Sequence, residues 1–181
     1  DQPSIVSPQT QIKRYLQALE LGRVEHGGFQ EGALVDLRPA VHAGKEIILV
    51  GDLHAQLGNL KRILTHDGNF ERLNSGKAVL LLLGDLVHRE PIFDDLTPLG
   101  EMTSSLEILS FIMEMKIAHP RNFYAHCGNH DFLNNGLSKA GVSQGELFKT
   151  TLTESYGPEF VEDYQAALAL GSLVAIMPGV V

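Results

Sequence analysis

Three short motifs place metal-capable side chains directly after apolar runs of the chain. They read GDLHAQ, GDLVHRE and CGNHD, and in each a glycine precedes the first polar side chain of interest. Those side chains are Asp52 with His54, Asp85, and Asn129 with His130. Carboxylate, imidazole and amide oxygen make a mixed oxygen and nitrogen ligand set without a thiolate. Such a set suits Mn²⁺, Fe or Zn²⁺ better than a structural zinc site.

One Gly-Asp pair or one histidine after a strand is most often a turn, a helix cap or a satisfied polar residue. Three matched motifs are a stronger signal, and they favour a metal site. Asp85, in the middle motif, is placed to bridge two ions. Two ions about 3.5–4 Å apart can hold a phosphoryl group, activate a water and stabilise in-line displacement.

The apolar runs that precede the motifs predict three buried strands, over residues 46–51, 78–84 and 122–127. Helical patterns at residues 57–65 and 99–118 lie between them. This alternation predicts an α/β fold with a mostly parallel sheet flanked by helices on both faces. The carboxyl ends of parallel strands share one edge, where the functional crevice of such sheets lies. The glycines let the backbone turn sharply as it leaves the sheet.

The remaining pattern predicts helices at residues 9–24, 144–156 and 158–170 and a fourth strand at 173–177, with a glycine-rich loop, HGGFQEG, after the first helix. We expect two regions. Residues 1–44 form an N-terminal helix and loop appendage, and residues 45–181 form the core.

Composition excludes several classes of protein. The formal charge of −8 offers no basic surface for nucleic acid, and 44% hydrophobic residues indicate a globular domain with a real core. The apolar stretches are too short to cross a membrane, and the single cysteine, Cys127, allows no intramolecular disulfide. No signal peptide pattern opens the sequence, so we expect a cytoplasmic protein unless a signal lies outside it. The oligomeric state stays open.

Taken in order, the motifs resemble the G-D-x-H, G-D-x-x-x-R and G-N-H-D/E series of the calcineurin-like metallophosphoesterases. The resemblance is closer to the phosphoprotein phosphatase branch, including its bacterial members, and it covers residues 46–181. It implies two divalent ions, with Mn²⁺ expected first and Fe or Zn²⁺ as alternatives. By position, it assigns as metal ligands Asp52 and His54 for the first ion, Asp85 for both, and Asn129 for the second.

The resemblance also implies roles around the ions. Arg89 takes the position of an arginine that grips phosphate, together with Asn129, and a guanidinium fork can engage two phosphate oxygens at once. His130 takes the position of the general acid that protonates the leaving alkoxide. Asp131 follows it, and we expect this carboxylate to support the ligands from behind.

The sequence departs from the family pattern at several positions. His88 replaces an aspartate that supports the general acid. We hypothesise that this second imidazole disfavours protonation of His130, or that His88 itself donates the proton. Ala55 and Glu90 replace glycines. No histidine follows His130, although the family uses two later ones as ligands, so we expect this chain to hold the N-terminal half to two-thirds of the fold.

The resemblance implies a phosphomonoester hydrolase that acts on phosphoproteins or phosphopeptides, at Ser/Thr or Tyr, by in-line attack of a water activated by two metal ions. Two alternatives remain open. The same motifs serve hydrolases of dinucleoside polyphosphates and other nucleotides. Loss of the late histidines could also leave a non-catalytic binding module on the same fold.

Overall fold

The computed structural model of the chain describes residues 6–133 and 136–178. Its centre is a sheet of three parallel strands in the order β3-β4-β5, and their bounds are Glu46–Val50, Ala78–Leu82 and Phe123–Ala125. These are the three strands that the sequence predicts. Their apolar runs are buried most completely at β4, where all five residues are buried.

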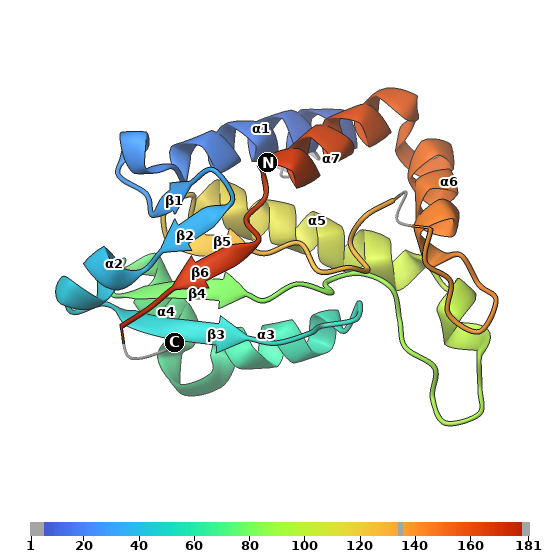
Figure 1. Ribbon diagram of the computed structural model, residues 1–181, viewed down its shortest axis with the longest axis horizontal. Helices are drawn as coiled ribbons and strands as arrows, with labels where there is room; N and C mark the ends of the chain where they lie inside the picture. The colour runs from blue at the N-terminus through green and yellow to red at the C-terminus, as the bar shows by residue number, and fades with distance from the viewer. Residues whose placement is uncertain (1–5, 134–135, 179–181) are drawn as a thin grey trace, which may run out of the picture.

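The register of this sheet places the three motifs at one edge. Val50, Leu82 and Ala125 are paired across the strands, so the strands end side by side. The arrows of β3 and β4 point toward the same side in Figure 1, and β5 runs parallel to β4. The loops that carry the motifs therefore leave the sheet together, as expected for parallel strands.

A second, smaller sheet has the order β1-β2-β6, with bounds Gln30–Glu31, Leu34–Asp36 and Val174–Ile176. Strand β1 runs antiparallel to β2, and β2 runs parallel to β6. A single bridge between His126 and Ser172 connects β5 with the segment before β6. The sequence predicts β6, whereas β1 and β2 lie in the segment that it assigns to a loop and appendage.

Helices surround the sheets. The longer ones are α1 (Pro8–Leu21), α3 (Leu57–Thr65), α5 (Thr103–Ala118), α6 (Gln144–Tyr156) and α7 (Pro158–Leu170). The short ones are α2 (Arg38–His42), α4 (Asn69–Asn74) and the 3₁₀ turns η1 (Val24–His26), η2 (His66–Gly68) and η3 (Thr97–Gly100). Among the described residues, no helix is both long and apolar enough to cross a membrane.

The two faces of the central sheet have different covers. Leu80 and Leu82 of β4 join a large core with side chains of α1, α3, α5, α6 and α7. Val79 and Leu81 face a smaller core that includes Val35 of β2. The α/β fold with a parallel sheet flanked by helices is confirmed. On the second face, helix α2 shares the cover with strands β2 and β6, since Ala40, Val35 and Ala175 belong to or pack against the smaller core.

The N-terminal segment shares the core of the rest of the chain. Helix α1 packs along α5 and α7 (Figure 1), and Ile12 and Leu19 are buried in the large core. Strand β2 pairs with β6, which lies about 140 residues further along the chain. The boundary between residues 44 and 45 stays a prediction, but the two regions are not packed as separate bodies.

Candidate metal centre

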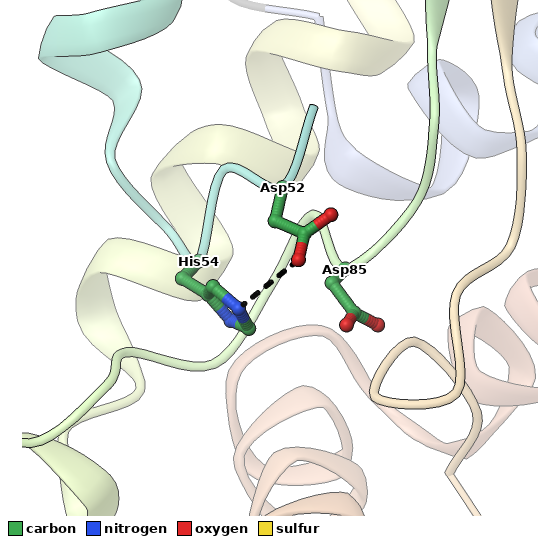
Figure 2. A group of neighbouring side chains, drawn as sticks. All are labelled: Asp52, His54 and Asp85. Atoms are coloured by element: carbon green, nitrogen blue, oxygen red, sulfur yellow. Dashed lines mark ion pairs between the residues drawn. The ribbon is translucent and has the colours of Figure 1, made fainter. Parts of the chain in front are cut away.

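Three of the predicted ligands meet at the carboxyl edge of the central sheet. Asp52, His54 and Asp85 each offer one ligand atom, and these atoms lie within 4.8 Å of one another. Figure 2 shows the three side chains converging from the loops after β3 and β4. Asp52 is exposed, and the other two are half-buried. A carboxylate, an imidazole and a second carboxylate at this separation fit one divalent cation, and their oxygen and nitrogen donors suit Mn²⁺, Fe or Zn²⁺.

Backbone strain concentrates in these two loops. The non-glycine residues His54 (φ 43°), Ala55 (φ 57°), Asp85 (φ 48°) and His88 (φ 66°) adopt the left-handed region. Such a conformation costs on the order of 1–3 kcal/mol at each residue and persists only where the surroundings impose it.

Backbone hydrogen bonds between the loops hold that conformation. The Asp85 carbonyl oxygen accepts from the N–H groups of Leu53 at 3.1 Å and His54 at 2.9 Å. The Leu86 carbonyl oxygen accepts from Ala55 N–H at 2.9 Å. The loop after β3 is thus fastened to the loop after β4, so Asp52, His54 and Asp85 are positioned as one unit.

The loop after β5 approaches Asp85 closely. A Cβ atom on Gly128 would overlap the backbone nitrogen and the carboxylate of Asp85, so only glycine fits there. Two residues on, the His130 N–H donates to Asp85 Oδ1 at 3.0 Å, and the His130 and His54 rings lie 5.9 Å apart, edge to face. Asn129, the predicted fourth ligand, is exposed on this loop, and its role stays a prediction.

The ring of His54 has a defined orientation. Its Nδ1 lies 3.2 Å from the His88 carbonyl oxygen and 3.4 Å from Glu90 Oε1, and its Nε2 lies 3.9 Å from Asp52 Oδ2. A carbonyl oxygen only accepts, so this contact places a proton on Nδ1. Nε2, on the side of Asp52, then keeps its lone pair for a cation.

Asp131 fastens the second and third loops from behind. Its Oδ1 accepts from the N–H groups of Leu86 at 2.8 Å and Val87 at 3.2 Å, and its Oδ2 accepts from Gly128 N–H at 2.8 Å. Burial raises the pKa of this carboxyl to about 6, and the nearby Asp85 carboxylate adds to the increase, while the three N–H groups oppose it. The predicted supporting role of Asp131 remains a prediction, and this position beneath the loops is consistent with it.

His88 is buried, with 1% of its surface exposed, and its ring packs edge-on against Phe148 at 5.3 Å. Among the described residues, neither ring nitrogen has a hydrogen-bond partner. Burial lowers the pKa of His88 to about 4, and the nearby imidazoles of His130 and His54 lower it further. His88 is therefore a neutral neighbour of His130, where the family pattern has a carboxylate.

Arg89 is half-buried beside the centre. Its Nη1 lies 3.9 Å from Glu101 Oε2, and its carbonyl oxygen accepts from Gln144 Nε2 at 3.1 Å. Glu101 precedes α5 and Gln144 opens α6, so two distant segments hold the arginine in place. Sequence reasoning missed Glu101, Gln144 and also Lys139, which pairs with Glu90. All three reach the site from loops or helix ends, and no motif marks them.

Comparisons with known proteins agree with this geometry. The family model described as calcineurin-like phosphoesterase matches residues 45–174. Among solved structures, the chain is similar to a protein serine/threonine phosphatase from Saccharomyces cerevisiae with similarity to human phosphatase PP5. The match has a TM-score of 0.66 and 19% sequence identity, and it covers 96% of this chain and 46% of the yeast chain. At this identity the likeness concerns the fold, and this chain spans about half the length of its relative.

The matched residues make up well over half of the chain and contain all three motifs together with the Asp52, His54 and Asp85 cluster. The resemblance that the motifs indicate is thereby confirmed, and the chain belongs to the calcineurin-like phosphoesterase family.

Proposed function

We propose that the protein is a metal-dependent phosphomonoester hydrolase that acts on phosphoproteins, at phosphorylated Ser/Thr or Tyr. The observation that supports this most is the convergence of Asp52, His54 and Asp85 ligand atoms within 4.8 Å, in a member of the calcineurin-like phosphoesterase family. The fold that the chain shares with a serine/threonine phosphatase supports the phosphoprotein substrate.

The ligand proposal uses residues of all three loops. Asp52 and His54 would hold one ion, Asp85 would serve both ions, and Asn129 would hold the second, with Mn²⁺ expected first. When bound, divalent ions supply a Lewis acid and a water activated for attack. Asp85 Oδ1 already accepts one hydrogen bond from His130 N–H. This bond keeps the carboxylate from rotating.

Two further side chains complete the proposed chemistry. The Arg89 guanidinium binds two phosphate oxygens of the substrate. Glu101, whose Oε2 lies 3.9 Å from Arg89 Nη1, restrains the guanidinium. His130 donates a proton to the leaving alkoxide, so that the departing serine, threonine or tyrosine is neutral.

The experiment uses the complete gene product loaded with Mn²⁺. Phosphate release is measured on a panel of phosphoserine, phosphothreonine and phosphotyrosine peptides beside dinucleoside polyphosphates, together with Mn²⁺ binding by calorimetry. We expect turnover of phosphopeptides and its loss, with loss of Mn²⁺ binding, in Asp85→Asn.

Other outcomes identify the alternatives. Preference for dinucleoside polyphosphates would assign a nucleotide hydrolase. Weak Mn²⁺ binding without any phosphate release would point to a binding module. Full activity in Asp85→Asn would rule out the bridging role of Asp85.

A further inference from the structure

A carboxylate at the end of the second motif, in the position of a family glycine, lies against the ring of His54. Glu90 Oε1 is 3.4 Å from His54 Nδ1, on the opposite side of the ring from Asp52. Both partners are partly shielded from water, since 35% of the Glu90 side chain and 20% of the His54 side chain are exposed. The same Nδ1 lies 3.2 Å from the His88 carbonyl oxygen. Two acceptors therefore face one nitrogen, and Nε2 is left for a cation.

The second oxygen of Glu90 is engaged as well. Lys139 Nζ forms an ion pair with Glu90 Oε2. Lys139 belongs to a tight turn in which its backbone N–H and that of Val142 donate to each other's carbonyl oxygens at 3.0 and 2.9 Å. With Oε2 held by this turn, Oε1 is directed at His54.

We propose that Glu90 is a positioning residue for His54, and that Lys139 sets the position of Glu90. A carboxylate on the far nitrogen of a ligand imidazole fixes the tautomer and the ring orientation, and it raises the electron density on the nitrogen that binds the metal. The inference rests on the proposed metal site, and it extends that site to a carboxylate in the position of a family glycine and to a lysine outside the three motifs.

The negative charge of Glu90 is central to this role. The His88 carbonyl oxygen alone can fix the tautomer, but a neutral carbonyl polarises the ring less than a carboxylate does. Removal of the charge with little change in shape, as in Glu90→Gln, should therefore weaken the metal site while the fold stays intact. Outer carboxylates of this kind typically contribute about 10- to 100-fold to metal affinity.

The first test measures Mn²⁺ affinity of the complete gene product by calorimetry, and the melting temperature of the metal-free protein. We expect Glu90→Gln to weaken Mn²⁺ binding by about 10-fold or more, with a melting temperature close to that of the wild type. Asp94→Asn is the matched control, because Asp94 is an exposed carboxylate on the same loop and its loss changes the net charge equally. We expect Asp94→Asn to bind Mn²⁺ as the wild type does.

The second test is a double-mutant cycle with Lys139→Met. If Lys139 acts only through Glu90, Lys139→Met changes Mn²⁺ affinity in the wild-type background and has no effect in the Glu90→Gln background. Equal effects in both backgrounds would overturn the role of Lys139.

The outcomes separate this inference from the proposed function. If the wild type binds Mn²⁺ and Glu90→Gln binds it equally well, the positioning role of Glu90 is overturned, and the proposed metal site is not. Equal weakening in Glu90→Gln and Asp94→Asn would also overturn it, since general electrostatics would then explain the effect. Absence of Mn²⁺ binding by the wild type would overturn the metal site, and the inference with it.

Discussion

Gly128 and Asp85 lie so close that their two loops can pack together only because Gly128 has no side chain. A Cβ on Gly128 would overlap the backbone nitrogen and the carboxylate of Asp85. We predict that Gly128→Ala pushes the third loop away from the centre. The expected results are a loss of about 1–3 kcal/mol in the free energy of unfolding, measured in urea, and much weaker Mn²⁺ binding, measured by calorimetry.

Gly58→Ala provides the control for that variant, because a Cβ on Gly58 in α3 meets no atom within 4 Å. An alanine inside a helix is more favourable than a glycine, so this variant should be as stable as the wild type or more stable. Unchanged Mn²⁺ affinity in Gly128→Ala would show that Asp85 does not depend on this contact.

A substitution at Arg89 distinguishes a role in substrate binding from a role in metal binding. Lysine keeps the positive charge but lacks the planar fork that pairs with two phosphate oxygens. A lost charge-assisted hydrogen bond costs about 1.5–3 kcal/mol, which corresponds to about a 10- to 100-fold loss in kcat/KM. We therefore expect Arg89→Lys to lower kcat/KM for phosphopeptides by that factor and to leave Mn²⁺ affinity unchanged. A parallel loss of Mn²⁺ affinity would mean that Arg89 maintains the metal loops instead.

For individual residues of the site, the sequence predicts those that directly follow a buried strand and misses those that belong to other loops and helix ends. Asp52, His54 and Asp85 are predictable because the apolar strands and their common direction determine where the next side chains lie. The partners Glu101, Lys139 and Gln144 are not predictable, since each reaches the site through a loop or a helix end whose path depends on tertiary packing. No local pattern encodes that path.

Among the secondary-structure elements, α5 contains an unusual buried cation. Lys116 Nζ donates to the carbonyl oxygens of Pro120 at 2.7 Å and Phe123 at 2.9 Å, and it lies 4.2 Å from the centre of the Tyr124 ring. These contacts connect the end of α5 to the start of β5. Burial lowers the pKa of Lys116 from 10.5 to about 7.

This lowered pKa predicts a pH dependence of stability. Below pH 7 both the folded and the unfolded protein carry the Lys116 proton, and the folded state bears the full cost of burying the charge. Between about pH 7 and pH 10 the folded state has released a proton that the unfolded state still holds, so stability rises with pH. We expect this contribution, on the order of a few kcal/mol, to vanish in Lys116→Met.

Urea unfolding at several pH values between 6 and 10 checks this expectation. The unfolding free energy of the wild type minus that of Lys116→Met should increase as pH rises. Lys77→Met, at an exposed lysine, is the control and should keep the wild-type pH dependence. A constant difference between wild type and Lys116→Met would contradict the lowered pKa.

Some helices and strands could be predicted from the sequence and others could not. Helices α6 and α7 occupy the predicted ranges, because Gly157 and Pro158 mark the break between two amphipathic stretches. Strands β1 and β2 escape prediction, since two or three residues are too few to display alternation. They exist because β2 pairs with β6 at the far end of the chain, which is a tertiary effect.

In the molecule as a whole, the three metal loops are held by a core to which the N-terminal segment also contributes. The family match begins at residue 45, yet Ile12 and Leu19 of α1 are buried among residues of the matched region. Tyr15 of α1 lines a small internal cavity together with Asp131, directly behind the loops. Sequence motifs locate the centre but not this support, because helix α1 bears no chemical signature of its own.

If α1 belongs to the same cooperative unit as the metal loops, damage to α1 must lower the stability of the whole molecule. Ile12 is fully buried, so Ile12→Ala removes apolar contacts and leaves a cavity, at a cost of about 2–5 kcal/mol. We expect one urea transition at a lower midpoint, and the same midpoint whether helix content or Mn²⁺ binding is followed. Arg14→Ala, at an exposed position of α1, should stay within about 0.5 kcal/mol of the wild type. Two separate urea transitions would contradict this. If Mn²⁺ binding were lost only in a transition with the wild-type midpoint, residues 1–44 would be an independent appendage.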